Sequence, residues 1–200
     1  LAAADLLRWL DKLLDPDLFT YLGSARDEIL PHLPPKLIAR IISELDSDDA
    51  LDLAIGLDDA QRAEVISYLS RRARAQLEEG FTFPDSSAGR LMQREAVGVP
   101  ELWTVGKLLD YLRAASGSLP EQYYEIYTVD SKRRVSGAVS LAQILSASRV
   151  TRLEALRGKD IHTIPAEMDQ EEVAALFRRY GLVSAPVIDE NERLLGMITA

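Results

Sequence analysis

The sequence predicts a multi-domain α+β protein, in which an all-α superhelical N-terminal domain precedes a duplicated β-α-β-β-α module. Three observations support this prediction. Leucines recur at a constant spacing in the first half, the second half contains two copies of one pattern, and Gly, Pro, Ser and Asp cluster between the halves. We therefore expect a helical domain at 1–84, a linker at 85–92, a first module at 93–150 and a second module at 151–200.

Composition narrows the classes of partner. The chain of 200 residues carries a formal net charge of −9, and 47% of its residues are hydrophobic. Duplex nucleic acid and anionic membrane surfaces both need clustered Lys and Arg, so we expect no nucleic-acid partner. The absence of cysteine excludes disulfides, thiolate metal sites and a cysteine nucleophile. No apolar run approaches the roughly 20 residues that a membrane span needs.

Helical periodicity accounts for the first half. Apolar residues at helical spacing predict a helix over 1–14, which ends at Asp15-Pro16, and a second helical segment covers 17–22. From residue 33 a 12-residue unit begins, with apolar residues at its ninth and tenth positions and cap residues after each leading leucine. The leading residues are Leu33, Leu45, Leu57 and Leu69. Each unit predicts a two-turn helix and a tight turn that must stack on neighbours, and the last is expected to continue as a longer helix to about Glu79.

Two matching copies make up the second half. In each copy an extended run ends at a proline, and a helix-capping residue follows four positions later. A hairpin comes next, in which Asp and Gly lie seven residues apart. The matching positions are Pro100, Thr104, Asp130 and Gly137 in the first copy and Pro165, Asp169, Asp189 and Gly196 in the second. The first copy has extra residues between helix and hairpin, around 116–120. A short helix over 141–146 follows the first hairpin.

This β-α-β-β-α pattern resembles a tandem pair of CBS (cystathionine-β-synthase-type) modules, with the second truncated because the chain ends. Together with the helical repeats, Asp85-Ser-Ser-Ala-Gly-Arg-Leu-Met92 and Asp169-Gln-Glu-Glu-Val173, residues 30–200 are similar to the cytosolic region of an MgtE-type magnesium channel. The resemblance implies a non-enzymatic Mg²⁺ sensor on the cytoplasmic side of the cell membrane. It also implies a homodimer formed through the CBS modules and a pore domain later in the same parent chain.

Two acidic clusters are candidate sites for Mg²⁺ or another divalent cation. No Lys or Arg lies between Arg40 and Arg62 or between Lys159 and Arg178, although both stretches are rich in Asp and Glu. Mg²⁺ is commonly held by one or two carboxylates with its waters retained. The resemblance implies that the ligands are Asp48, Asp52, Asp169 and Glu171. The structural alternative is that these acids cap helices and favour helix N-termini.

An adenine nucleotide, ATP or AMP, is the other candidate ligand. Nucleotide-binding CBS modules carry Ser/Thr-x-x-Asp after the hairpin, which points to Ser140 and Gln143 in the first copy and Thr199 in the second. Glutamine replaces the aspartate in the first motif, and the second stops at Ala200. A third reading is a helical-repeat scaffold that merely dimerises. No Ser/His/Asp set, phosphate loop or paired-acid signature is evident, so an enzyme is not expected.

Overall fold

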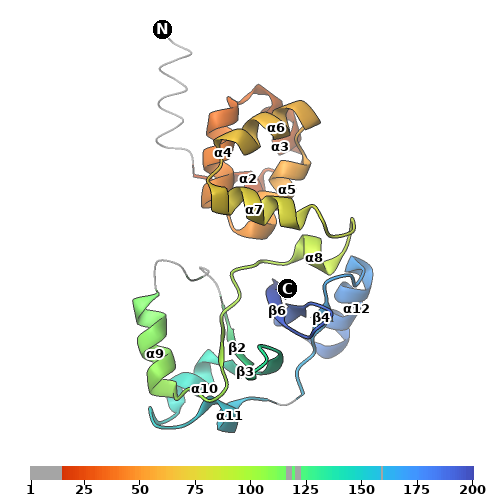
Figure 1. Ribbon diagram of the computed structural model, residues 1–200. Helices are drawn as coiled ribbons and strands as arrows, with labels where there is room; N and C mark the ends of the chain where they lie inside the picture. The colour runs from red at the N-terminus through yellow and green to blue at the C-terminus, as the bar shows by residue number, and fades with distance from the viewer. Residues whose placement is uncertain (1–14, 116–118, 120–122, 159) are drawn as a thin grey trace. The chain divides into compact units, whose positions relative to one another are not determined.

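The computed structural model describes residues 15–115, 119, 123–158 and 160–200 of the chain (Figure 1). The chain divides into two compact units, the first ending at Thr82 and the second beginning at Phe83. The described part of the first unit is helical, and the second contains two three-stranded sheets with helices. The predicted α+β class is confirmed. The helix expected over 1–14 lies outside the described residues.

Four helices of the first unit follow the predicted repeat. The preceding elements are α2 (Leu18–Tyr21), α3 (Ser24–Ile29) and the 3₁₀ helix η1 (Leu30–His32), and the repeat helices are α4 (Pro35–Glu44), α5 (Ser47–Ile55), α6 (Asp59–Tyr68) and α7 (Arg71–Gly80). Leu45 and Leu69 are the extended residues that end α4 and α6. One helix and one turn therefore make up each repeat.

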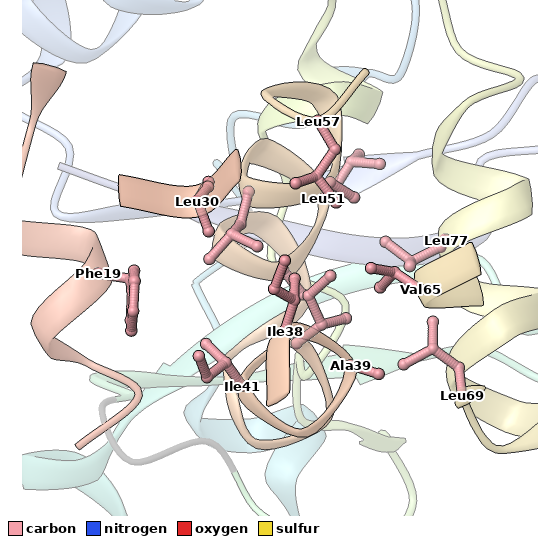
Figure 2. Packing of buried hydrophobic residues seen from close by; sticks show 14 of the residues in the cluster. Phe19, Leu30, Ile38, Ala39, Ile41, Leu51, Leu57, Val65, Leu69 and Leu77 are labelled. Atoms are coloured by element: carbon pink, nitrogen blue, oxygen red, sulfur yellow. The ribbon is translucent and has the colours of Figure 1, made fainter. Parts of the chain in front are cut away.

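The ninth position of every repeat lies in the core of this unit. Ile41, Leu53, Val65 and Leu77 are at most 4% exposed. Figure 2 shows labelled side chains from α4, α5, α6 and α7 gathered around a common interior. Burial of an aliphatic side chain stabilises a fold by about 1.5–3 kcal/mol, so this stripe is a main source of the stability of the stack.

The helix of the last repeat ends at Gly80, next to the predicted end at about Glu79, but it is no longer than α4 or α6. α7 contains 10 residues, the same number as α4 and α6. Ser70 stands at its N-cap, where the side chain accepts a hydrogen bond from the Ala73 N–H at 3.2 Å. A serine cap satisfies an N–H that a new helix would leave without a partner, so the chain breaks after Leu69 and starts again.

Both copies in the second unit have the predicted β-α-β-β order. The first contains β1 (Gly98–Pro100), α9 (Val105–Ala114), β2 (Glu125–Val129), β3 (Val135–Ser140) and α10 (Leu141–Ser146), and the second contains α11 (Leu153–Leu156), β4 (Ile164–Pro165), α12 (Gln170–Tyr180), β5 (Ser184–Ile188) and β6 (Leu194–Thr199). β1 pairs with β2 in parallel and β2 with β3 antiparallel, and β4, β5 and β6 repeat this order. The predicted short helix at 141–146 is α10.

The predicted linker at 85–92 belongs instead to the second unit. It contains α8 (Ala88–Leu91), and Ala88 is fully buried in a core cluster with Val173 and Phe177 of α12. The Ala88 N–H donates to the Met168 carbonyl at 2.8 Å, and the Gly89 N–H donates to Ala166 at 2.7 Å. These contacts hold the leading segment (residues 83–93) against the start of α12. Its Gly, Pro and Ser residues form a tight docked turn rather than a free connection.

The same docking recurs at the matching positions of the other copy, so the duplication is longer than the sequence pattern indicated. The Leu153 N–H of α11 donates to the Trp103 carbonyl at 2.9 Å, as Ala88 donates to Met168. The docking is crossed between the copies. Residues before the first copy pack on the second, and residues before the second copy pack on the first.

Crossed docking also explains the glycine in each hairpin. A Cβ on Gly196 would lie 2.5 Å from the carbonyl oxygen of Gln93 in the leading segment. A Cβ on Gly137 would lie 2.5 Å from the carbonyl oxygen of Gly158. Because a backbone passes so close to each strand, only glycine fits without displacement.

Candidate metal centre

Asp48 is the most perturbed carboxylate of the predicted site. It lies in the first turn of α5, and its Oδ1 atom is buried without a hydrogen-bond partner in the described part of the chain. Burial, followed by the nearby negative charge of Asp49, raises its pKa to about 6. Both effects disfavour the ionised form, and a bound cation would favour it.

Asp52 is one helical turn further along α5, on the same face as Asp48. Its carboxylate accepts a hydrogen bond from the Arg26 guanidinium of α3 at 2.5 Å, and its side chain is 63% exposed. Burial, followed by the charge of Asp52, also raises the pKa of Asp49. This face of α5 therefore holds close negative charges that a single arginine only partly offsets.

Asp169 and Glu171 lie at the start of α12. Asp169 is the N-cap, and its Oδ1 accepts a hydrogen bond from the Glu171 N–H at 2.7 Å. The backbone beside it is held by the leading segment, because the Gln170 N–H donates to the Ser86 carbonyl at 2.8 Å. The capping role considered from the sequence is therefore present at Asp169. Both acidic side chains are exposed at this helix N-terminus.

The four predicted ligands divide between the two units. Asp48 and Asp52 share one helix face in the first unit, whereas Asp169 and Glu171 share one helix start in the second. Over residues 15–115, 119, 123–158 and 160–200, no group of three or more His, Asp or Glu side chains has an arrangement that could hold a metal ion. The four-residue magnesium site remains a prediction.

The residues predicted to bind a nucleotide have structural contacts of their own. Ser140 and Gln143 form a capping box at α10, in which the Ser140 N–H donates to Gln143 Oε1 at 3.0 Å and the Gln143 N–H donates to Ser140 Oγ at 3.2 Å. Gln143 Nε2 also donates to the Leu156 carbonyl at 3.3 Å. Thr199 is exposed at the end of β6, paired with Ser184. Both ends of the Gln143 side-chain amide are therefore engaged by backbone groups, the oxygen by Ser140 and the nitrogen by Leu156.

A cleft that the sequence did not predict lies in the second unit. The hairpin cleft, of about 870 Å³, is open to solvent and is lined by the two hairpin turns and the chain around β1. Its lining includes the charged residues Arg94, Glu101, Asp130, Arg133, Asp189 and Arg193. The Asp and Gly spacing predicted each turn, but no local pattern showed that the turns meet. There the Val135 N–H donates to the Glu192 carbonyl at 3.0 Å.

A buried hydrogen-bonded chain also connects the two sheets. The Tyr127 hydroxyl donates to Ser184 Oγ at 3.1 Å, and Ser184 Oγ donates to a Glu125 carboxylate oxygen at 3.0 Å. Tyr127 is fully buried, and burial raises the pKa of its phenol to about 12. The phenol is therefore neutral at physiological pH and able to donate this hydrogen bond.

Two family models match the chain. The model described as the MgtE intracellular N domain matches residues 2–86, and the CBS domain model matches residues 154–200. Magnesium transporter MgtE of Thermus thermophilus is 36% identical over 154 residues, which are 77% of this chain and 34% of the relative. Magnesium transporter MgtE of Bacillus subtilis is 24% identical over 158 residues, 79% of this chain and 35% of the relative. The chain thus spans about a third of the length of these curated relatives.

Solved structures match over most of the chain. The cytosolic domain of the Mg²⁺ channel MgtE in complex with ATP has a TM-score of 0.81 and 33% sequence identity, covering 95% of this chain and 75% of that one. The soluble part of a magnesium transporter also has a TM-score of 0.81, with 26% identity over 100% of this chain and 75% of that one. Within the described residues, every helix is too short or too polar to cross a membrane.

Proposed function

This chain belongs to the MgtE family, and on that premise we propose that it is the Mg²⁺-sensing regulatory region of a magnesium transporter or channel. Its similarity to a cytosolic domain of 33% identity supports this assignment. As a member of this family it is regulatory rather than an enzyme. In this proposal the first unit, which ends at Thr82, and the second unit, which begins at Phe83, are the two bodies whose separation changes with Mg²⁺.

One observation carries the proposal: a carboxylate on the acidic face of α5 is ionised near neutral pH although burial and neighbouring negative charges disfavour its ionised form. Burial and like charges raise the pKa of Asp48 to about 6. Near neutral pH the carboxylate is nevertheless ionised in most molecules, and its buried Oδ1 has no hydrogen-bond partner in the described residues. A divalent ion at Asp48 and Asp52 would offset this cost.

The proposed gating step is a closure of the two domains. Without Mg²⁺, carboxylates of α5 and of α12 repel each other, so an open arrangement is favoured. With Mg²⁺, ions bridge Asp48 and Asp52 to Asp169 and Glu171, and the closed arrangement is favoured. A ligand shifts such an equilibrium only through its different affinity for the two states, and bridging supplies that difference.

The remaining partners follow from the family and are proposals for this chain. We propose that the region lies on the cytoplasmic side of the cell membrane, that a pore domain in the same parent chain responds to closure, and that CBS modules of two chains form a homodimer. Exposed apolar side chains on the second unit suit such an interface. They include Tyr111 at 41%, Tyr180 at 50%, Leu145 at 76% and Val150 at 81% exposure.

Small-angle scattering across a millimolar Mg²⁺ titration tests the closure. We expect the radius of gyration to fall for the natural chain and to stay constant for the Asp48→Asn/Asp52→Asn double variant. Asp59→Asn is a matched control, because Asp59 is a first-turn acid of α6 with a 99% exposed side chain outside the proposed site. A natural chain whose profile does not change with Mg²⁺ would rule out the closure. If the radius of gyration of Asp59→Asn also stayed constant with Mg²⁺, Asp48 and Asp52 would be ruled out as the specific ligands.

Adenine-nucleotide sensing is the second candidate function, favoured by one observation. A structure similar to this chain is a cytosolic MgtE domain in complex with ATP. Calorimetric titration with ATP, AMP and Mg²⁺ added separately distinguishes the two functions. Heat with Mg²⁺ alone supports the ion sensor, heat with a nucleotide in the absence of Mg²⁺ supports the nucleotide sensor, and no heat with any of them supports the scaffold reading.

A further inference from the structure

The chain between the two units is anchored on the side of the first unit up to its last residue. The Phe81 N–H donates to the Leu77 carbonyl at 3.0 Å, and the Phe81 ring packs against the core of that unit. Thr82 is held to the end of α7, since its N–H and its hydroxyl donate to the Glu79 carbonyl at 3.1 and 2.7 Å. The backbone of the first unit is therefore fixed as far as Thr82.

The second unit is anchored from the next residue onward. The Phe83 ring packs against the core of the second unit, and a Cβ added to Gly89 would lie 2.4 Å from this ring. The Phe83 carbonyl accepts a hydrogen bond from Arg90 Nε at 2.9 Å. Phe83 also precedes Pro84, and the residue before a proline is restricted to extended conformations. Few torsions therefore remain free between the two anchors, and they lie around the bond that joins Thr82 to Phe83.

An arginine connects the first anchor to α5, the helix that carries two of the proposed ligands. Arg62 Nε donates to the Ala54 carbonyl at 2.9 Å, and Arg62 Nη2 donates to the Leu57 carbonyl at 2.6 Å, so the side chain caps the C-terminal end of α5. The same guanidinium lies over the Phe81 ring, 5.5 Å from its centroid. The end of α5 is therefore tied through Arg62 to Phe81.

On the other side, the chain reaches the start of α12 within four residues. The Ser86 carbonyl accepts the Gln170 N–H at 2.8 Å, and Ser87 pairs with Asp169 in an antiparallel bridge. Ser86 makes this contact with a φ of 60°, in the left-handed region that few residues other than glycine adopt. Four residues of extended chain span at most about 14 Å, so the path from Thr82 to this contact is short in any arrangement of the units.

We propose that the bond between Thr82 and Phe83 is the pivot of the domain closure, and that Phe83 is a positioning residue for Mg²⁺ bridging between α5 and α12. This pivot rests on the proposed function, because it is the place about which the proposed closure turns. A short tether makes the association of two bodies intramolecular, with an effective concentration that falls roughly as the −3/2 power of tether length. A pivot tied to both helices therefore strengthens bridging without adding a ligand.

The same insertion made at two places tests the pivot. Six Gly and Ser residues inserted after Thr82 lengthen the path to Ser86 from four residues to ten, which lowers the effective concentration about fourfold. The same six residues inserted after Glu95 are the matched control. They add as much chain between α7 and β1, but they leave that path unchanged, because residues 83–93 are docked on the second copy.

The readout is the midpoint of the Mg²⁺-dependent fall in the radius of gyration. We expect the insertion after Thr82 to raise this midpoint about fourfold if one ion bridges the units and about twofold if two ions do. We expect the insertion after Glu95 to leave the midpoint at its natural value. Equal shifts for the two insertions, or no shift for either, would refute the pivot.

Distances between pairs of spin labels test the pivot without any ion. The chain contains no cysteine, so introduced cysteines can be labelled specifically. Leu91→Cys, at the end of α8, is combined with Glu78→Cys or with Arg71→Cys, and these two positions of α7 are seven residues, or about 10 Å, apart. In a metal chelator we expect a narrow distance distribution for the Glu78 pair and a broad one for the Arg71 pair, because the Arg71 label is farther from the pivot along α7.

Each outcome decides either the pivot or the closure. Distributions of equal width would refute the pivot, since a flexible linker broadens both and a rigid junction narrows both. If Mg²⁺ changed neither distribution, the closure would be refuted, while the widths in chelator would still decide the pivot. Phe83→Ala, which removes the second anchor, should broaden the Glu78 pair, whereas Phe83→Tyr, which keeps the ring, should not. Equal effects of these two substitutions would contradict the positioning role of Phe83.

Discussion

Replacing Asp48 by asparagine removes a carboxylate whose ionised form is disfavoured by its surroundings in the first unit. The pKa of this carboxyl is raised from 3.8 to about 6, chiefly by burial. A difference of about two pKa units corresponds to roughly 3 kcal/mol, which is the upper limit of the cost of ionising Asp48 in the folded state. Asparagine also loses the favourable interaction of an acid with a helix N-terminus, about 0.3–1 kcal/mol. We therefore expect Asp48→Asn to stabilise the metal-free protein by about 1–2 kcal/mol at pH 7.5.

The pH dependence identifies the cause. Below about pH 4, Asp48 is protonated in the folded and unfolded states, so the natural chain carries no ionisation cost. Between about pH 4 and 6 the unfolded state loses its proton first, and the natural chain loses stability relative to the variant. Above about pH 6 the difference is constant. The advantage of Asp48→Asn should therefore appear as pH rises through this window.

Differential scanning calorimetry in a metal chelator measures this effect, because it can resolve separate transitions of the two units. A gain of about 1 kcal/mol in a domain of this size raises the transition temperature by about 4–8 °C. Asp59→Asn is the control, since it is a first-turn acid whose side chain is 99% exposed. The burial argument would be refuted if the change in stability caused by Asp48→Asn did not vary with pH. It would also be refuted if Asp48→Asn changed the stability no differently from Asp59→Asn.

Three further predictions follow from individual contacts. Arg26→Gln should increase the Mg²⁺ affinity of the chain, measured by calorimetry, because its guanidinium occupies the Asp52 carboxylate; unchanged or weaker affinity would contradict competition at this site. Gly196→Ala should destabilise the second unit by about 1–3 kcal/mol in urea unfolding, because the added Cβ would collide with the leading segment. Gly158→Ala is the control and should leave stability nearly unchanged, because a Cβ added there meets no atom within 4 Å. Equal effects of these two substitutions would argue against docking of that segment. Gln143→Ala should cost about 1 kcal/mol through loss of the capping box and leave ATP binding unchanged, and reduced ATP binding would restore the nucleotide role predicted from the sequence.

Much of the fold could be predicted because it depends on residues close together in the chain. The repeat spacing and its caps located α4 to α6, and the matched apolar stripes located α9 and α12. Each hairpin was recognisable from its Asp and Gly spacing. Such patterns record which face of an element is buried and where its backbone turns, and both are local properties.

The candidate sites could be predicted less completely, because their chemistry depends on surroundings that a local pattern does not specify. Asp48 and Asp52 were recognised as acids on one helix face. Their environments differ, because Asp48 is half-buried with its Oδ1 atom fully buried, whereas Asp52 is paired to Arg26; both depend on how the helices of the first unit pack. The same holds for Gln143, whose amide is taken up by its own capping box and by the backbone of α11.

By itself, the sequence determined the order of elements, the duplication and the acidic character of two helix starts. Only the tertiary structure decided where the leading segment docks, since its hydrogen bonds join residues far apart in the chain, such as Gln93 and Met197. It also decided that the two hairpin turns meet and line an open cleft, which includes Arg133 and Arg193. Periodicity describes how a segment contacts the core, whereas the partner that it meets depends on the packing of the whole unit.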